Sequence, residues 1–235
     1  MEKRSLLISG IKAGLPIAIG YIPIAITFGL LAKSTGIPNY ITVCMSLIVF
    51  AGASQFVGVK LMAIGATSWE IIMTTFILNF RHFLMSSSLS RKIESGTSKK
   101  WLSIISFGIT DESFTVASLR KENKLSPIFL LALNTTAFSA WVSGTAVGVF
   151  LATGLPGSLT NSMGIALYAM FIGLLVPSVK GSKPILLVAL TAMITSYLIG
   201  IIPFLNNLSS GWSIIIATIT AALIGAILYP RGVKN

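Results

Sequence analysis

The chain has 235 residues, of which 54% are hydrophobic and only 10% are charged, and its mean hydropathy is +0.89. This composition excludes a soluble globular domain and is typical of an all-α integral membrane protein. Seventeen Lys and Arg against six Asp and Glu give a net charge of +11, but the basic residues form short clusters at the ends of apolar stretches. Such clusters indicate membrane orientation and exclude a nucleic-acid interface.

We expect one integral-membrane domain over residues 1–235, a helix bundle of about seven or eight spans at ~20 residues each. Residues 1–13 form a basic, amphipathic lead-in of the kind that lies at a membrane interface. Leu15–Ala32 is the first predicted span, and its glycines and prolines favour kinks and close helix packing. Ile41–Ile64 is the second. Small residues before a glutamine at Ala51–Phe56 predict a broken or re-entrant helix there, because an amide in lipid needs a partner.

The third predicted span, Ile71–Ser90, carries polar groups that hydrocarbon does not solvate. Asn79, Arg81 and His82 lie close together in it, and an arginine near the bilayer centre costs about 2.5–3.5 kcal/mol by insertion scales. We expect the polar side chains to face protein or water. One helical face carries a polar stripe, formed by Asn79, His82, Ser86 and Ser90.

The segment 101–119 is apolar enough to enter the membrane, yet Asp111 and Glu112 lie at its middle. Basic residues flank both of its ends, so it either crosses the bilayer or dips in and returns to the cytoplasmic side. A return leaves about seven crossings with the N-terminus outside, whereas a crossing gives about eight with both termini inside. The charge distribution is compatible with both counts.

Four further spans are predicted, at residues 127–152, 161–179, 184–204 and 211–229. The loops between them alternate between uncharged and basic, and the tail carries Arg231 and Lys234, so the C-terminus is predicted to be cytoplasmic.

Two short segments are similar: GLLAKSTGIP at Gly29–Pro38 and GVFLATGLP at Gly148–Pro156. Either two membrane helices end in the same common turn, or the chain contains an internal repeat. Repeats separated by an odd number of crossings would be inverted, an architecture that places a binding site at the bilayer midplane. The repeat therefore favours seven crossings.

Five phrases carry a family resemblance. In chain order they are LPIAIGYIPIAITFGLLA, FAGASQF, NFRHFLMSSSLS, TDESF and NTTAFSAWVSGTAVG. Together they resemble the AzlC family, the large subunit of bacterial branched-chain amino-acid exporters, from about Gly14 to the last span. The resemblance implies a multi-pass permease of the bacterial inner membrane. It also implies a small AzlD-type membrane subunit as partner, and export of leucine, isoleucine, valine and in some cases methionine.

An aliphatic amino acid is a zwitterion with an apolar tail, so its site needs a cation, an anion and an apolar pocket. Arg81 is the candidate for the substrate carboxylate, in competition with backbone N–H groups at a helix break near Gly52–Ser54. Ser54, Gln55 and Asn79 are further candidates for contacts to polar atoms of the substrate. His82, Asp111 and Glu112 are candidates for proton coupling, and the two carboxylates also for binding the ammonium group.

Each of these assignments has a structural alternative. Arg81 can form an ion pair with Asp111 or Glu112, and the two carboxylates can lie in a solvated cytoplasmic turn. His82, Gln55 and Asn79 can serve as hydrogen-bonded links between helices. The lone Cys44 supports neither an intrachain disulfide nor a metal site, and we expect no cofactor.

Two other functions are alternatives to transport. A structural or assembly subunit would use its buried polar residues only to bind a partner. An intramembrane serine hydrolase would need a serine beside His82, but nothing else around Ser54 marks a nucleophile, so no enzymatic activity is expected. The chain has no GxxxxGK[ST] phosphate-binding loop, which favours transport driven by an ion or substrate gradient.

Overall fold

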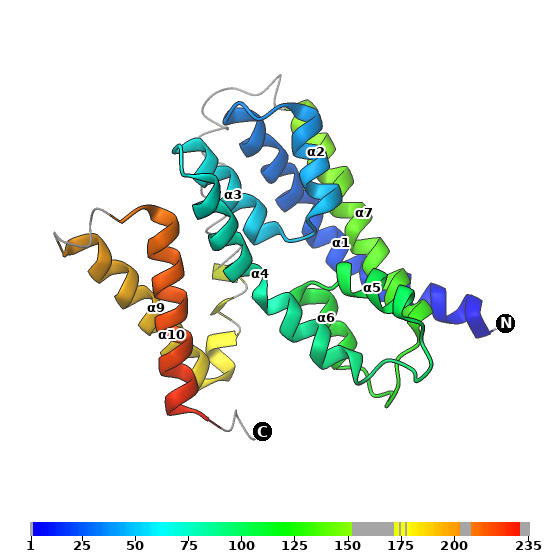
Figure 1. The fold of residues 1–235 in the computed structure, drawn as a ribbon. Coiled ribbons are helices and arrows are strands. Elements are labelled where there is room, and N and C mark those ends of the chain that lie inside the picture. Colours follow the sequence, from blue (N-terminus) through cyan, green and yellow to red (C-terminus); the bar gives the residue numbers. More distant parts are fainter. Residues whose placement is uncertain (1, 152–171, 174, 177, 203–207, 231–235) are drawn as a thin grey trace. The chain divides into compact units, whose positions relative to one another are not determined.

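The computed structural model describes residues 2–151, 172–173, 175–176, 178–202 and 208–230. Within these ranges the regular elements are α-helices joined by short turns, which confirms the predicted fold class (Figure 1). The helices are α1 (Glu2–Ser34), α2 (Asn39–Ile48), α3 (Gly52–Ala63), α4 (Ser68–Ser90), α5 (Lys99–Phe107), α6 (Asp111–Ser118), α7 (Pro127–Leu151), α9 (Lys183–Ile201) and α10 (Ser210–Leu228). Four of them, α1, α7, α9 and α10, are long and apolar enough to cross a membrane.

The chain divides into two compact units. The first consists of Met1–Val59 and Leu78–Ala166, and the second of Lys60–Ile77 and Leu167–Asn235. Helices α3 and α4 each contribute residues to both units. The predicted span 161–179 lies mostly outside the described residues.

Helix α1 is one continuous helix of 33 residues, so the predicted lead-in and first span belong to the same element. Pro16 and Pro23 lie inside it without ending it. A proline leaves a backbone carbonyl of the preceding turn without its amide donor, and nearby hydroxyl groups commonly satisfy such carbonyls in membrane helices. Thr27 Oγ1 donates to the carbonyl of Pro23 itself at 2.9 Å, an additional hydrogen bond in the turn that follows this proline.

Helices α1 and α7 run parallel and touch along most of their length. A Cβ atom at Gly10 would lie 2.5 Å from the carbonyl oxygen of Phe129, and one at Gly29 would lie 2.3 Å from that of Thr145. The contacts therefore advance in the same direction along both helices. Gly148 allows the same approach from α7, since a Cβ atom there would overlap the backbone of α1. Small residues let two backbones approach closely in membrane helix pairs of this kind.

The segments proposed as an internal repeat begin at the ends of these two helices. Most of the second copy, from residue 152 onward, lies outside the described residues. Because α1 and α7 are parallel, the inverted relation between the two copies is not confirmed.

Helices α2 and α3 form a hairpin with its turn at Val49–Ala51. Along α2 the chain runs antiparallel to α7, because the hydroxyls of Ser46 and Thr145 lie 2.8 Å apart and Phe50, one turn later, packs edge-on against Phe138. The turn therefore lies beside the middle of α7.

Helix α3 returns in the direction from which α2 came. The ring of Phe50 contacts that of Tyr21 on α1, with 6.1 Å between centroids, whereas Phe56 contacts Phe28, two turns further along α1, at 5.5 Å. The expectation of a broken helix within Ile41–Ile64 is confirmed, with the break at Val49–Ala51, at the start of the predicted segment Ala51–Phe56.

Helices α5 and α6 form a second hairpin, and its base is closed. Ile93 and Leu125 form an isolated parallel bridge, with Glu94 N–H donating to the Leu125 carbonyl at 3.1 Å and Leu125 N–H donating to the Lys92 carbonyl at 2.7 Å. Lys92 Nζ also donates to the carbonyl of Ser118, the last residue of α6, at 2.7 Å. The chain therefore enters and leaves this hairpin at the same place.

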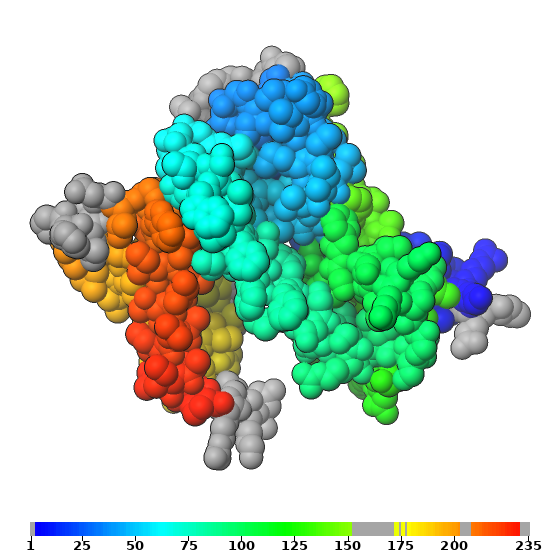
Figure 2. Space-filling view, viewed as in Figure 1, coloured from blue at the N-terminus to red at the C-terminus, as the bar shows by residue number. Residues whose placement is uncertain are grey.

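The turn of the second hairpin, Gly108–Thr110, is held by α7. Asn134 Nδ2 donates to the carbonyl of Ile105 at 3.0 Å, and a Cβ atom at Gly108 would lie 2.6 Å from the Asn134 side chain. Figure 2 shows this hairpin, in green, packed beside the last turns of α4. Both hairpins thus bring their turns to the paired helices α1 and α7.

In the second unit, α10 begins at a carboxylate. Glu70 Oε1 accepts a hydrogen bond from Gly211 N–H at 2.8 Å, and the Glu70 side chain is buried. A carboxylate near the positive N-terminal end of a helix is electrostatically favourable, so this contact fixes the start of α10. Sequence reasoning did not identify Glu70 as a buried acid. Glu70 is the third residue of α4, and side chains in the first turn of a helix are commonly exposed.

Candidate functional site

The turns of the two hairpins meet at Tyr21, in the middle of α1. Its hydroxyl donates to the Glu112 carboxylate on α6 and lies 2.8 Å from Thr110 Oγ1 in the second turn. Its ring packs edge-on against Phe50 in the first turn and against Trp141 on α7, at 6.1 and 5.5 Å between centroids. One side chain therefore connects both helix breaks with the two long helices.

The sequence around Thr110 explains why α6 begins there. Thr110 is the N-cap, and it forms a capping box with Ser113, since Thr110 N–H donates to Ser113 Oγ at 2.9 Å and Ser113 N–H donates to Thr110 Oγ1 at 3.3 Å. Asp111 and Glu112 follow in the first turn, where carboxylates are stabilised by the helix dipole. This cap places both acids at the turn of the hairpin.

Arg81 and Asp111 form an ion pair between α4 and α6. Arg81 Nη1 lies 2.5 Å from Asp111 Oδ2, and the two side chains are 39% and 36% exposed. The buried Nε atom of Arg81 has no hydrogen-bond partner among the described residues. The guanidinium therefore has one buried donor that the described side chains do not satisfy, and the partial exposure of both side chains leaves the pair accessible.

A second polar link joins α4 to the start of α3. Ser54 Oγ donates to Asn79 Oδ1 at 2.5 Å, and the Ser54 side chain is buried. Asn79 lies only two residues before Arg81 on α4, so these contacts bring three of the four predicted substrate-binding residues close to the junction of the hairpins.

The first turn of α3 is covered by an aromatic ring. A Cβ atom at Gly52 would lie 2.7 Å from Cη2 of Trp141, so the indole packs directly on the start of the helix. Backbone N–H groups at this break compete with Arg81 for a carboxylate in the sequence-based hypothesis. Because the indole covers Gly52 and the guanidinium is partly exposed, the geometry favours Arg81.

Gln55, the fourth predicted residue, belongs to a buried hydrogen-bond network. Trp141 Nε1 donates to Gln55 Oε1 at 2.8 Å, and Gln55 Nε2 donates to Ser46 Oγ at 3.1 Å. The Ser46 and Thr145 hydroxyls are 2.8 Å apart, and Thr145 Oγ1 donates to the Trp141 carbonyl at 2.9 Å. Each of these groups has its partner within the network, so the arrangement indicates a structural role for Gln55.

We expect Trp141→Phe to destabilise the protein by about 1–3 kcal/mol, because the substitution leaves the buried Gln55 oxygen without a donor. Thermal unfolding in detergent measures this loss. Trp69→Phe is the matched control, since Trp69 is 61% exposed. Equal changes in melting temperature for the two variants would contradict the role of the network.

His82 follows Arg81 directly on α4. It lines a cavity of about 470 Å³ together with Phe83, Ser86 and Ser87 of α4 and Ser106 of α5. Its Nδ1 atom lies 3.3 Å from the carbonyl oxygen of Asn79, one turn back on the same helix. The predicted polar stripe therefore divides: Asn79 contacts α3, whereas His82 and Ser86 line the cavity.

Two residues at the centre of the site were missed by sequence reasoning. Tyr21 lies in the middle of an apolar helix, where a phenolic hydroxyl needs a polar partner, so its position in Leu15–Ala32 was the available signal. Thr110 preceded two acids and a serine, which is the pattern of a helix start. Neither signal shows which distant side chain completes the contact.

Interrupted helices that meet around charged side chains within an apolar protein are typical of membrane transporters. The chain is an integral membrane protein. Residues 16–155 match the family model described as AzlC protein, and the chain belongs to the AzlC family.

Relatives of known sequence agree with this membership. The chain is 33% identical over 230 residues to an uncharacterised membrane protein of Archaeoglobus fulgidus, covering 97% of this chain and 96% of the relative. It is 32% identical to the inner membrane protein YgaZ of Escherichia coli, covering 83% and 81%. It is 28% identical to the branched-chain amino acid transport protein AzlC of Bacillus subtilis, covering 73% and 69%. No solved structure shows significant similarity to this chain.

Proposed function

We propose that the chain exports branched-chain amino acids, with the Arg81–Asp111 pair as the centre of its substrate site. One observation carries this proposal: the pair is partly exposed and lies where the turns of the two helical hairpins meet. The Nε atom of its arginine has no hydrogen-bond partner among the described residues. A related protein named for branched-chain amino acid transport supports the substrate class.

A zwitterionic substrate fits this pair because it carries both opposite charges. Its carboxylate would bind the Arg81 guanidinium, which forms two parallel hydrogen bonds with carboxylates. Its ammonium group would bind Asp111, so the substrate would replace the direct ion pair and leave neither charge unpaired. Ser54 hydrogen-bonds to Asn79, which lies two residues before Arg81 on α4, and both would contact the polar end of the substrate.

Aromatic rings beside the turns supply the apolar surface for the aliphatic side chain. Phe107, the last residue of α5, packs edge-on against Phe138 of α7 at 5.7 Å, and Phe138 in turn contacts Phe50 at 5.3 Å. Phe107 is 47% exposed and adjoins the turn that carries Asp111. Leucine, isoleucine and valine differ by little more than the branching of a few carbons, so this surface would accept all three.

The same geometry leads us to a membrane topology with two re-entrant hairpins. The hairpin of α2 and α3 enters from the side where α1 ends, and the hairpin of α5 and α6 from the side where α7 begins. Helices α1, α4, α7, α9, α10 and the predicted span 161–179 would then make about six crossings. This count differs from the predicted seven or eight, because Ile41–Ile64, and in the count of eight also residues 101–119, would return in this topology instead of crossing.

The distribution of basic residues supports this topology. In it only Lys33 and Lys60 lie at outer helix ends, and Arg81 lies within the bilayer, while all other lysines and arginines lie on the cytoplasmic side or in the inner part of α1. Both termini would be cytoplasmic.

Coupling to a proton gradient is the simplest energy source for this site. Glu112 accepts the Tyr21 hydrogen bond beside the ion pair, and His82 lines a cavity and follows Arg81 directly on α4. These groups, with Asp111, are positioned to exchange a proton as substrate binds and leaves. The family resemblance adds a small AzlD-type subunit as the expected partner.

Flux of radiolabelled leucine tests the proposal. Cells that produce this chain together with the small subunit should export preloaded leucine faster than cells that produce neither, and a protonophore should abolish export against a concentration gradient. The absence of leucine flux with and without the small subunit would reject the transport proposal in favour of an assembly role. Unchanged concentrative export after the protonophore would reject proton coupling alone.

A further inference from the structure

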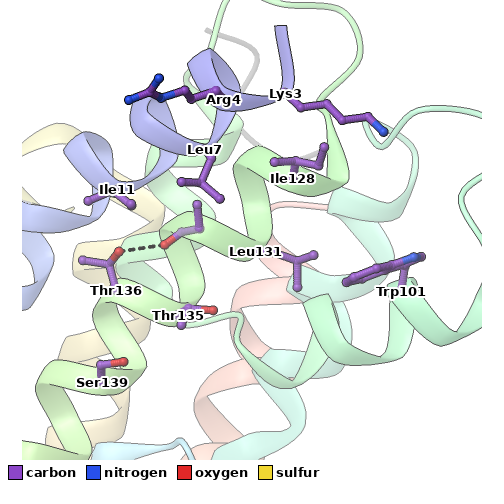
Figure 3. Close-up of a pocket in the computed structure, with 11 residues that line it drawn as sticks. Lys3, Arg4, Leu7, Ile11, Trp101, Ile128, Leu131, Thr135, Thr136 and Ser139 are labelled. Atoms are coloured by element: carbon purple, nitrogen blue, oxygen red, sulfur yellow. Dashed lines mark hydrogen bonds between the residues drawn. The ribbon is translucent and has the colours of Figure 1, made fainter. Parts of the chain in front are cut away.

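A long apolar groove runs between the N-terminal part of α1, the first half of α7 and the start of α5. Its volume is about 920 Å³, within the range of ligand-binding pockets. Figure 3 shows Lys3 and Arg4 at one end of the groove and Ser139 at the other. The walls between them are mainly apolar, formed by Leu7, Ile11, Ile128, Leu131 and Ala132, with Trp101 at the side.

The length of the groove matches one leaflet of a bilayer. Along α7 it extends from Ile128 to Ser139, which at a rise of 1.5 Å per residue is about 16 Å. The hydrocarbon core of a bilayer is about 30 Å thick, so half of it is about 15 Å. A membrane-spanning helix would need a groove twice as long, whereas an acyl chain needs one of this length.

In the proposed topology, the charged end of the groove lies on the cytoplasmic side, at the level expected for lipid headgroups. Lys3 and Arg4 are exposed, and neither forms an ion pair with an acidic side chain in the part of the chain that the structure describes. Trp101 lies at the side of the groove, beside Leu131 (Figure 3). Two exposed cations at the end of an apolar groove complement a phosphate attached to alkyl chains.

We propose that this groove binds one anionic phospholipid of the cytoplasmic leaflet, with its phosphate at Lys3 and Arg4 and an acyl chain along Leu7, Ile11 and Leu131. The proposal is independent of the transport site. The floor of the groove is the contact between α1 and α7, where Cβ atoms at Gly10 and Gly14 would meet Ala132 and Thr136. The lipid therefore covers the joint between the two helices that hold both hairpins.

Native mass spectrometry of the purified full chain tests this site, with dioleoyl phosphatidylglycerol and dioleoyl phosphatidylcholine as probes. We expect one phosphatidylglycerol to bind at least about 10-fold more tightly than phosphatidylcholine, since each cation near a headgroup contributes about five-fold. The double variant Lys3→Gln/Arg4→Gln should lose this preference. Lys99→Gln/Lys100→Gln is the matched control, because it removes the same charge from exposed residues that do not line the groove.

A second variant tests the position of the acyl chain without changing the charge. Thr135 is exposed and lines the groove, so Thr135→Phe should fill the space and weaken phosphatidylglycerol binding at least several-fold. Equal binding of both lipids would overturn the proposal. An equal loss of phosphatidylglycerol preference in Lys3→Gln/Arg4→Gln and in Lys99→Gln/Lys100→Gln would also overturn it. Unchanged phosphatidylglycerol binding in Thr135→Phe would do the same. A photo-crosslinker at position 135 that captures a membrane protein and no phospholipid would assign the groove to a partner helix instead.

Discussion

Asp111→Asn is expected to lower leucine export by at least about 10-fold, which corresponds to about 1.4 kcal/mol at the substrate site. Asparagine keeps the size of the side chain and its place in the first turn of α6 but removes the charge that pairs with Arg81. The substrate ammonium group then has no anion to bind, and the arginine is left without its counter-charge. Export measured at equal protein abundance in the membrane tests this expectation.

Glu122→Gln is the matched control for this variant. Glu122 also pairs with an arginine, Arg120, at 2.6 Å, but in an exposed loop where hydrogen bonds from the guanidinium lower the pKa of the carboxyl group. Exposed ion pairs contribute little, so export should change less than about two-fold. Normal export by Asp111→Asn would contradict a role for the pair in transport.

The exchanged pair Arg81→Asp/Asp111→Arg separates a structural from a functional role. Because the two side chains are each about one-third exposed, the exchanged pair should restore most of the stability lost in either single variant. If the pair only joins α4 to α6, export should return with stability. We expect stability without export, because the substrate carboxylate and ammonium would each meet a like charge at their former positions.

Gly29→Ala is expected to be the most destabilising glycine-to-alanine substitution on α1. The new Cβ atom would lie 2.3 Å from the Thr145 carbonyl oxygen and 2.9 Å from Val149 N, both of them backbone atoms of α7 that have no freedom to rotate away. The helices must separate, and we expect a loss of about 1–3 kcal/mol or more by comparison with overpacked cores. Unfolding in detergent, followed by size-exclusion chromatography after heating, measures the change.

Gly20→Ala is its control on the same helix. A Cβ atom at Gly20 would meet no atom within 4 Å, and alanine favours a helix over glycine by up to about 1 kcal/mol. The melting temperature should therefore stay the same or rise. Equal losses at Gly20 and Gly29 would show that the close approach of α1 and α7 does not stabilise the fold.

The sequence predicts the helices well because each apolar stretch is long and is bounded by charged or turn-forming residues. Pro127–Leu151, Lys183–Ile201 and Ser210–Leu228 agree closely with their predicted ranges. The break within Ile41–Ile64 was also expected, since Gln55 needs a partner in an apolar setting. The partners themselves, such as Trp141, could not be predicted, because the hydrogen bond joins residues 86 positions apart.

Topology was the harder part to predict, for a physical reason. Hydropathy reports whether a segment enters the bilayer, but a segment that enters and returns has nearly the same composition as one that crosses. The evidence for a return at residues 101–119 is the pairing of Ile93 with Leu125, a backbone contact between flanking loops that side-chain patterns do not encode. Gly108 at the turn was visible in the sequence, but a single glycine occurs in many continuous membrane helices.

The candidate site was predicted in its composition but not in its arrangement. Arg81 pairs with Asp111, one of the two carboxylates considered for it, while Glu112 contacts Tyr21 instead. Adjacent residues on a helix point about 100° apart, so at most one of two neighbouring acids can face a given partner. The residue at which α6 begins decides which of the two acids faces Arg81, and the Thr110 N-cap sets that residue.

The closed base of the second hairpin has a consequence for the order of assembly. Helices α5 and α6 have nine and eight residues, too short for either to be stable across a bilayer alone, and they carry two acids at their turn. They can enter only a cavity whose polar walls already exist, and those walls include Tyr21 on α1 and Asn134 on α7. Since α7 is synthesised after the hairpin, α5 and α6 must wait at the membrane surface until α1 and α7 have paired. We therefore expect the hairpin to be the last part of its unit to fold, and the proposed substrate site to be completed only at that step.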